Sequence, residues 1–76
     1  MDASEELRAA ATGYRAAAAS PRDAALADLL EEAARKAAVR EAGWQLAGYS
    51  PAEQQQLAES WWRNELAVAR GRGATH

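Results

Sequence analysis

The stretch Ser50-Pro51-Ala52-Glu53 decides the fold, because it is one of three helix starts written into the chain. The same pattern occurs as Ser20-Pro21-Arg22-Asp23, and a shorter version places Asp2 three residues before Glu5. A Ser or Asp oxygen accepts from a free backbone N–H of the first helical turn, and the acidic residue favours the positive end of the helix dipole. Proline fits the first helical position, where no N–H is needed. The sequence therefore predicts three helices.

The ends of these helices are indicated by proline and glycine. Ser20 precedes a proline, which pushes it out of the helical region and ends the first helix. The second helix could end at Gly43 or at Gly48, and we favour Gly48 because it forms one compact corner with the next helix start. Gly71 and Gly73 are expected to stop the third helix. The predicted helices are 3–19, 21–47 and 51–70, within a single domain over 1–70 that is followed by a disordered tail over 71–76.

The composition predicts a small and weak core. Hydrophobic residues make up 49% of the 76 residues, but 22 of them are Ala, and Ile and Phe are absent. A core this small stabilises a domain only marginally unless a disulfide, a metal or association adds to it. The chain has no Cys, and its single His is His76, so association is the remaining route. We expect an all-α fold, either a three-helix up-down-up bundle or a helical hairpin completed by association.

The charge pattern argues against several partners. The formal net charge is −2 and the pI is about 5.3, so the whole chain has no electrostatic bias toward nucleic acid or anionic membranes. Charged residues interrupt every alanine stretch before it reaches the length of a membrane span. The acidic start, where a targeting peptide would be basic, favours a cytoplasmic protein. Lys36 is the only lysine among nine basic residues, which indicates a GC-rich bacterial gene.

Apolar residues at helical spacing indicate which faces are buried. The first helix carries an alanine face that ends at Tyr14, and this face could pack within the chain or form a dimer seam. The second helix is apolar on two sides, which is typical of a helix sandwiched between others. Its polar edge offers two ion pairs, Glu31–Arg35 and Glu32–Lys36. In the third helix Ala58, Trp62, Leu66 and Ala69 form one apolar stripe, and Leu57, Trp61 and Val68 form a second.

The pair Trp61-Trp62 is the first candidate for a binding site. Adjacent helical residues point about 100° apart, so one indole can fill the core while the other lies at its rim or against a partner. Trp and Arg dominate binding hot spots, and Arg63 is adjacent. We predict a partner-binding surface formed by Leu57, Trp61, Trp62 and Arg63. Tyr14 with the alanine face of the first helix is the second candidate. On the sequence alone, replacing either tryptophan with Ala is expected to abolish association and leave much of the helicity.

Catalysis is not expected, because the chain has no Cys nucleophile, no internal His and no glycine-rich phosphate loop. We likewise expect no cofactor and no metal site, and no membrane partner. The predicted function is a protein-protein interaction module, acting as an accessory or regulatory subunit or as a self-associating bundle. The alternative is a dimeric helix-turn-helix-like DNA-binding regulator. Against that alternative, no basic residue occurs between Arg40 and Arg63, and useful DNA binding typically neutralises about 6–10 phosphates.

Overall fold

A computed structural model describes residues 2–17 and 20–74, which form helices and no strand. The all-α fold class is therefore confirmed, although the described residues form four helices where the sequence predicts three. The helices are α1 (Ala3–Ala16), α2 (Pro21–Leu46), α3 (Pro51–Trp61) and α4 (Arg63–Ala74). The first helix is shorter than predicted: Ala17 caps it, and Ala18 and Ala19 lie outside the described residues.

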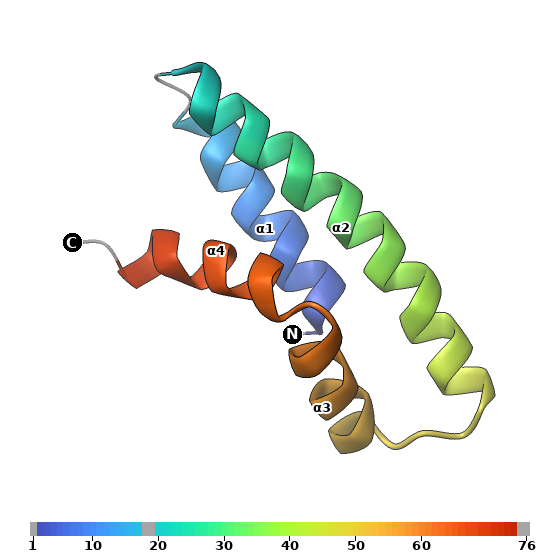
Figure 1. The fold of residues 1–76 in the computed structure, drawn as a ribbon. Helices are drawn as coiled ribbons and strands as arrows, with labels where there is room; N and C mark the ends of the chain where they lie inside the picture. The colour runs from blue at the N-terminus through green and yellow to red at the C-terminus, as the bar shows by residue number, and fades with distance from the viewer. Residues whose placement is uncertain (1, 18–19, 75–76) are drawn as a thin grey trace.

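The helices form an elongated molecule of 42 × 22 × 16 Å (Figure 1). Helices α1 and α2 run antiparallel, and α2, with 26 residues, extends past the start of α1. Helix α3 returns beside the first turns of α1, and the chain then bends so that α4 crosses α1 (Figure 1). The second half of α2 is therefore covered on one side only.

The three predicted helix starts are confirmed. Ser50 and Glu53 form a reciprocal capping box, in which each residue's side chain accepts from the other's backbone N–H, at 3.2 and 2.9 Å. The other two caps each accept from one backbone N–H of the first turn: Asp2 from that of Glu5 at 2.9 Å, and Ser20 from that of Asp23 at 3.4 Å. These local bonds fix where each helix begins, because they satisfy backbone donors that have no partner within the helix.

The second helix ends at Gly48, as favoured by the sequence. Gly48 has a φ of +88°, a conformation that L side chains rarely adopt. Its N–H donates to the carbonyl of Gln45, and the N–H of Tyr49 donates to that of Trp44, both at 3.1 Å. This pair of bonds is the Schellman closure, which satisfies two carbonyls at the end of a helix. Gly43 lies inside α2.

Alanine dominates the core. The three largest fully buried side chains are Leu7, Leu30 and Leu66. Around them lie small buried side chains, which allow the helices to pack closely. The buried alanines are Ala3, Ala10, Ala11, Ala27, Ala33, Ala34, Ala37, Ala58 and Ala69. Ala10 and Ala11 on the alanine face of α1 are thus covered within the chain, mainly by α2, and the dimer seam stays a prediction. The second apolar side of α2 is not sandwiched, since Leu29 is 50% exposed.

The predicted third helix is broken at Trp62. This residue has φ −109° and ψ 30°, which is outside the helical range, and it separates α3 from α4. Of the two apolar stripes, the first is the buried one: Ala58, Trp62, Leu66 and Ala69 all lie in the core. The bend lets α4 cross α1 while these side chains still face the core. Neither proline nor glycine marks the break in the sequence, so it depends on tertiary packing.

The glycines after Arg70 do not stop the helix, contrary to prediction. Helix α4 continues through Gly71 and Gly73 to Ala74. A glycine in a helix costs only about 1 kcal/mol relative to Ala, and no proline follows. Gly71 does not adopt the positive φ that a glycine stop requires. The predicted disordered tail is therefore corrected for residues 71–74, and Thr75 and His76 lie outside the described residues.

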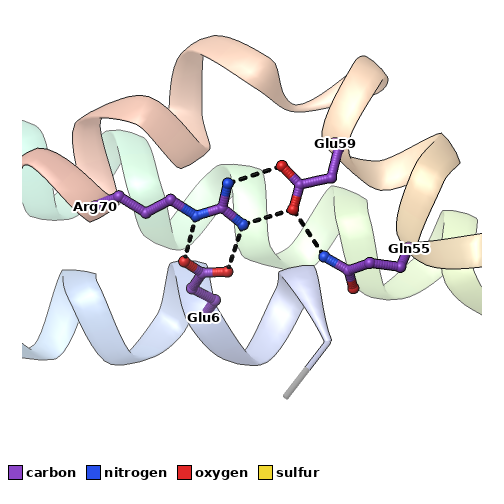
Figure 2. A network of polar contacts seen from close by, with 4 residues as sticks. All are labelled: Glu6, Gln55, Glu59 and Arg70. Carbon is purple, nitrogen blue, oxygen red and sulfur yellow. Dashed lines mark hydrogen bonds and ion pairs between the residues drawn. The ribbon is translucent and has the colours of Figure 1, made fainter. Parts of the chain in front are cut away.

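Arg70 joins three helices. Its guanidinium donates to both carboxylate oxygens of Glu6 on α1, at 2.8 and 3.1 Å, and to both of Glu59 on α3, at 2.7 and 2.6 Å (Figure 2). Gln55 donates to Glu59 at 2.8 Å and completes the cluster. The hydrogen bonds from Arg70 hold the pKa of Glu59 below its usual value, and the hydrogen bonds that Arg70 donates to Glu59 and Glu6 raise the pKa of Arg70. This cluster fixes the bend between α3 and α4.

Two glycine substitutions test the end of α2. Gly43→Ala should raise the free energy of unfolding by about 0.5–1 kcal/mol, because Ala favours a helix and the new Cβ meets nothing within 4 Å. Gly48→Ala should lower it by about 1–2 kcal/mol, because the residue must keep a positive φ. Urea unfolding followed by circular dichroism measures both. Equal effects of the two substitutions would contradict the helix end described here.

Replacing Arg70 tests the cluster that fixes the bend. Arg70→Met should lower the free energy of unfolding at pH 7 by about 1 kcal/mol, a modest value because the three charged side chains remain partly exposed to solvent. Arg8→Met is the control, because Arg8 forms no ion pair among the described residues.

The effect of Arg70→Met should also depend on pH. A carboxylate whose folded pKa lies below its unfolded value of 4.5 stabilises the fold above that value, and the contribution is lost as the pH falls through the folded pKa. The difference between wild type and Arg70→Met should therefore be full at neutral pH and shrink below about pH 4. Thermal unfolding at several pH values measures it, and a difference that stays constant in acid would contradict the assignment to Glu59.

Candidate functional site

A groove lies between the second half of α2 and the end of α3. It has a volume of about 700 Å³. Its lining residues are Arg35, Lys36, Val39 and Arg40 from α2, with Trp61 and Trp62 from the opposite wall. We call it the tryptophan groove. It lies where α2 is covered on one side only, so its position follows from the length of α2 and from the bend at Trp62.

Trp61 and Arg40 form the outer edge of the groove. The Arg40 guanidinium lies 3.9 Å from the centre of the Trp61 ring. A cation over an aromatic face is stabilising by about 0.5–1 kcal/mol at an exposed site. The contact holds the indole in one orientation although Trp61 is 55% exposed. Val39 lies beside it and is 76% exposed, so an aromatic ring and an aliphatic side chain face solvent together.

Trp62 forms the inner wall of the groove and is part of the core. It is only 7% exposed, and it belongs to the same buried cluster as Leu7 and Leu30. Its indole Nε1 is buried, and no acceptor among the described residues lies within hydrogen-bond distance. A buried donor without a partner costs about 1–3 kcal/mol. The packing of the large ring outweighs this cost, since burying a large side chain contributes about 1.5–3 kcal/mol and fills the space between the helices.

Three cations line the groove, and only Lys36 has a carboxylate partner among the described residues. Lys36 pairs with Glu32 at 3.4 Å, as predicted. The predicted pair between Glu31 and Arg35 does not form, because Glu31 binds Arg15 of α1 at 2.8 Å. Arg35 consequently has no carboxylate partner among the residues that the structure describes. No acidic residue of the described chain lines the tryptophan groove, although acidic residues outnumber basic ones by 11 to 9 in the whole sequence.

A second, shallower groove continues the first toward the start of α2. It has a volume of about 110 Å³ and shares Lys36 and Trp62 with the tryptophan groove. Its other lining residues are Leu29, Glu32, Ala33 and Glu65. The combined surface is therefore apolar along its length, with cations at one end and two carboxylates at the other. Leu29 supplies an exposed apolar side chain at the acidic end.

The structure brings together only two of the five predicted site residues. Trp61 and Trp62 line the tryptophan groove, whereas Leu57 is half-buried and Arg63 is exposed outside it. Tyr14 packs against the core, and its hydroxyl donates to the backbone carbonyl of Val68 at 3.4 Å. Leu57, Arg63 and Tyr14 therefore do not line a common groove with the tryptophans. Their predicted roles in binding a partner stay predictions.

Sequence reasoning missed Val39, Arg35 and Arg40. The run from Arg35 to Arg40 holds three of the nine basic residues of the chain and a β-branched residue, and this concentration was the available signal. The helical pairing rule instead assigned Arg35 to Glu31 on the same helix. Only the position of Arg15 on the neighbouring helix shows that this carboxylate is engaged there.

A polar cleft of about 360 Å³ lies between the start of α1, the last turns of α2 and α3. Its acidic residues are Asp2 and Glu41. Glu41 accepts from the backbone N–H of Ser4 at 3.2 Å, and burial raises the pKa of its carboxyl. Burial also works to raise the pKa of Asp2. The hydrogen bonds that its carboxylate accepts from Glu5 and Ser4 outweigh this effect, so the pKa of Asp2 is lowered. The side chains in this cleft serve to cap and position α1.

The described residues contain no group of three or more His, Cys, Asp or Glu side chains that could hold a metal ion. None of the described helices is long and apolar enough to cross a membrane. Comparison of the chain with protein-family models, with curated proteins and with solved structures found no match. The function is therefore argued from the geometry of the grooves.

The two tryptophans should respond differently to substitution. Trp62→Ala should lower the free energy of unfolding by about 3–5 kcal/mol and unfold most of the chain, because it removes the largest buried ring. Trp61→Ala should lower it by about 1 kcal/mol or less, because it removes only an exposed ring and its contact with Arg40. Circular dichroism and urea unfolding measure both. For Trp62→Ala this replaces the expectation from sequence that the variant keeps much of its helicity.

Trp62→Phe is the matched control for ring packing. It removes the unpartnered Nε1 donor and keeps an aromatic ring, so it should be less destabilising than Trp62→Ala. If Trp61→Ala proved as destabilising as Trp62→Ala, the division into one core and one surface tryptophan would be wrong.

Proposed function

We propose that this chain is a small helical protein-interaction module and that the tryptophan groove is its contact surface. The observation that carries the proposal is the exposed Trp61 ring, held by Arg40 beside the exposed Val39. Trp and Arg are the residues that most often dominate binding energy at interfaces. A ring that is already oriented loses less conformational freedom on binding than a mobile one.

The way the fold is built also supports association. The fully buried large side chains are few, and much of the core is alanine. The second half of α2 keeps apolar side chains on its uncovered side, with Val39 and Leu46 exposed to solvent. A partner that covers this side would complete the hairpin of α1 and α2 and stabilise it by mass action. The proposed role is an accessory or regulatory subunit, or a self-associating bundle, with no catalytic step assigned to the chain.

Site-specific photo-cross-linking in the native cell tests this proposal. A photo-reactive amino acid at Val39 should capture a protein in stoichiometric yield, or a second copy of the chain, whereas the same group at Arg8 on α1 should not. Adding Trp61→Ala should abolish the cross-link at Val39 while the chain stays folded. Equal capture from both positions, or capture that persists without Trp61, would overturn the proposal.

The cations of the groove keep DNA binding as a second candidate. Arg35, Lys36 and Arg40 lie on one surface, where phosphates could approach them. Recovery of cross-linked nucleic acid, or loss of the complex after nuclease treatment, would favour this candidate over the protein partner. Salt gives a further distinction, because binding through phosphates weakens steeply as salt rises, and an aromatic contact responds much less.

A further inference from the structure

We infer that the partner of the tryptophan groove is an amphipathic helix with an apolar face flanked by carboxylates. This inference rests on the function proposed above and adds the chemistry of the partner. It is carried by charge: three cations surround the exposed Val39 and Trp61, and no described acidic residue lines that groove. A partner helix with Asp or Glu beside its apolar face would place negative charges next to these three cations.

The dimensions of the surface fit a short helix. From Leu29 to Arg40 the two grooves follow α2 over twelve residues, and the eleven steps between the first and the last span about 16 Å at 1.5 Å per residue. A partner helix of about three turns covers this length and presents apolar residues at i, i+3 or i+4, and i+7. Leu29 and Val39 would contact the ends of such a stripe, and Trp61 would cover its side.

The distribution of charge along the surface sets the position of the partner's acids. Arg35 and Arg40 lie at the end of the surface nearest Trp61, and Glu32 and Glu65 lie at the end nearest Leu29. Carboxylates of the partner therefore belong beside the tryptophans, and they would be repelled at the other end. Arg35 is the most available cation, because Glu31 is engaged by Arg15.

The same charges disfavour two other occupants. A second copy docked with its tryptophan groove directly against this groove would bring three cations against three cations. A nucleic acid would gain only three cationic contacts, fewer than the roughly 6–10 that are typical, and it would meet the carboxylates of Glu32 and Glu65. An acidic amphipathic helix uses the apolar and the cationic parts of the surface together.

Three synthetic peptides of about twelve residues test the inference with the full chain. The first has a leucine face with glutamates beside it, the second has the same face with lysines beside it, and the third has the composition of the first in an order that breaks the face. Fluorescence anisotropy measures each Kd, and a single-stranded oligonucleotide serves as the polyanion without an apolar face. The first peptide should bind at least about tenfold more tightly than the other three probes.

Variants of the chain locate the contacts. Arg35→Glu should weaken binding of the glutamate peptide about three- to thirtyfold and reduce its dependence on salt, whereas Arg8→Glu on α1 should leave both unchanged. Trp61→Ala should weaken it by at least about tenfold. Circular dichroism of each variant confirms that it is folded, so a loss of binding reports on the surface.

The outcomes of these experiments distinguish a failure of the inference from a failure of the proposed function. Equal binding of the glutamate and lysine peptides, lost with Trp61→Ala but unaffected by Arg35→Glu, would overturn the acidic partner and leave the interaction surface in place. Tighter binding of the oligonucleotide than of any peptide would overturn both. No binding of the glutamate peptide up to about 1 mM would also overturn the inference, and the cross-linking at Val39 would then decide the proposed function by itself.

Discussion

The burial of the Trp62 indole is the interaction on which the other features of this fold depend. Its ring joins the core at the point where α3 ends, and Ala58 before it and Leu66 after it are buried in the same cluster. The bend at Trp62 turns α4 across α1 (Figure 1), where Arg70 reaches Glu6. With the indole removed, nothing comparable in size would hold α3 and α4 against the first two helices.

The alanine-rich core has a direct consequence for the surface. Because small side chains fill most of the contact between α1 and α2, several of the larger apolar side chains of the chain remain outside the core. Val39 and Trp61 are exposed, and the bend places them on the two walls of one groove. A surface with oriented apolar side chains next to cations is suited to binding, whereas scattered apolar residues would not be.

Ion pairs elsewhere in the molecule determine the charge of this groove. Arg15 engages Glu31 and Asp28, so Glu31 is not paired with Arg35. This cluster joins the consecutive helices α1 and α2, and the cluster of Arg70 with Glu6 and Glu59 joins α4 to α1 and α3. The same contacts that stabilise the packing therefore leave an excess of positive charge at the tryptophans, in a chain whose net charge is −2.

The sequence by itself determined the helix starts and the two apolar stripes of the last segment, and it favoured Gly48 over Gly43 as the end of α2, because caps, glycine closures and helical periodicity act within a few residues. It also singled out Trp61 and Trp62. The tertiary structure alone decided the break at Trp62, the continuation of α4 past Gly71 and the partner of Glu31. Those outcomes depend on side chains of other helices. The free energies of the competing local and tertiary contacts differ by only about 1 kcal/mol, so packing between the helices selects one of them.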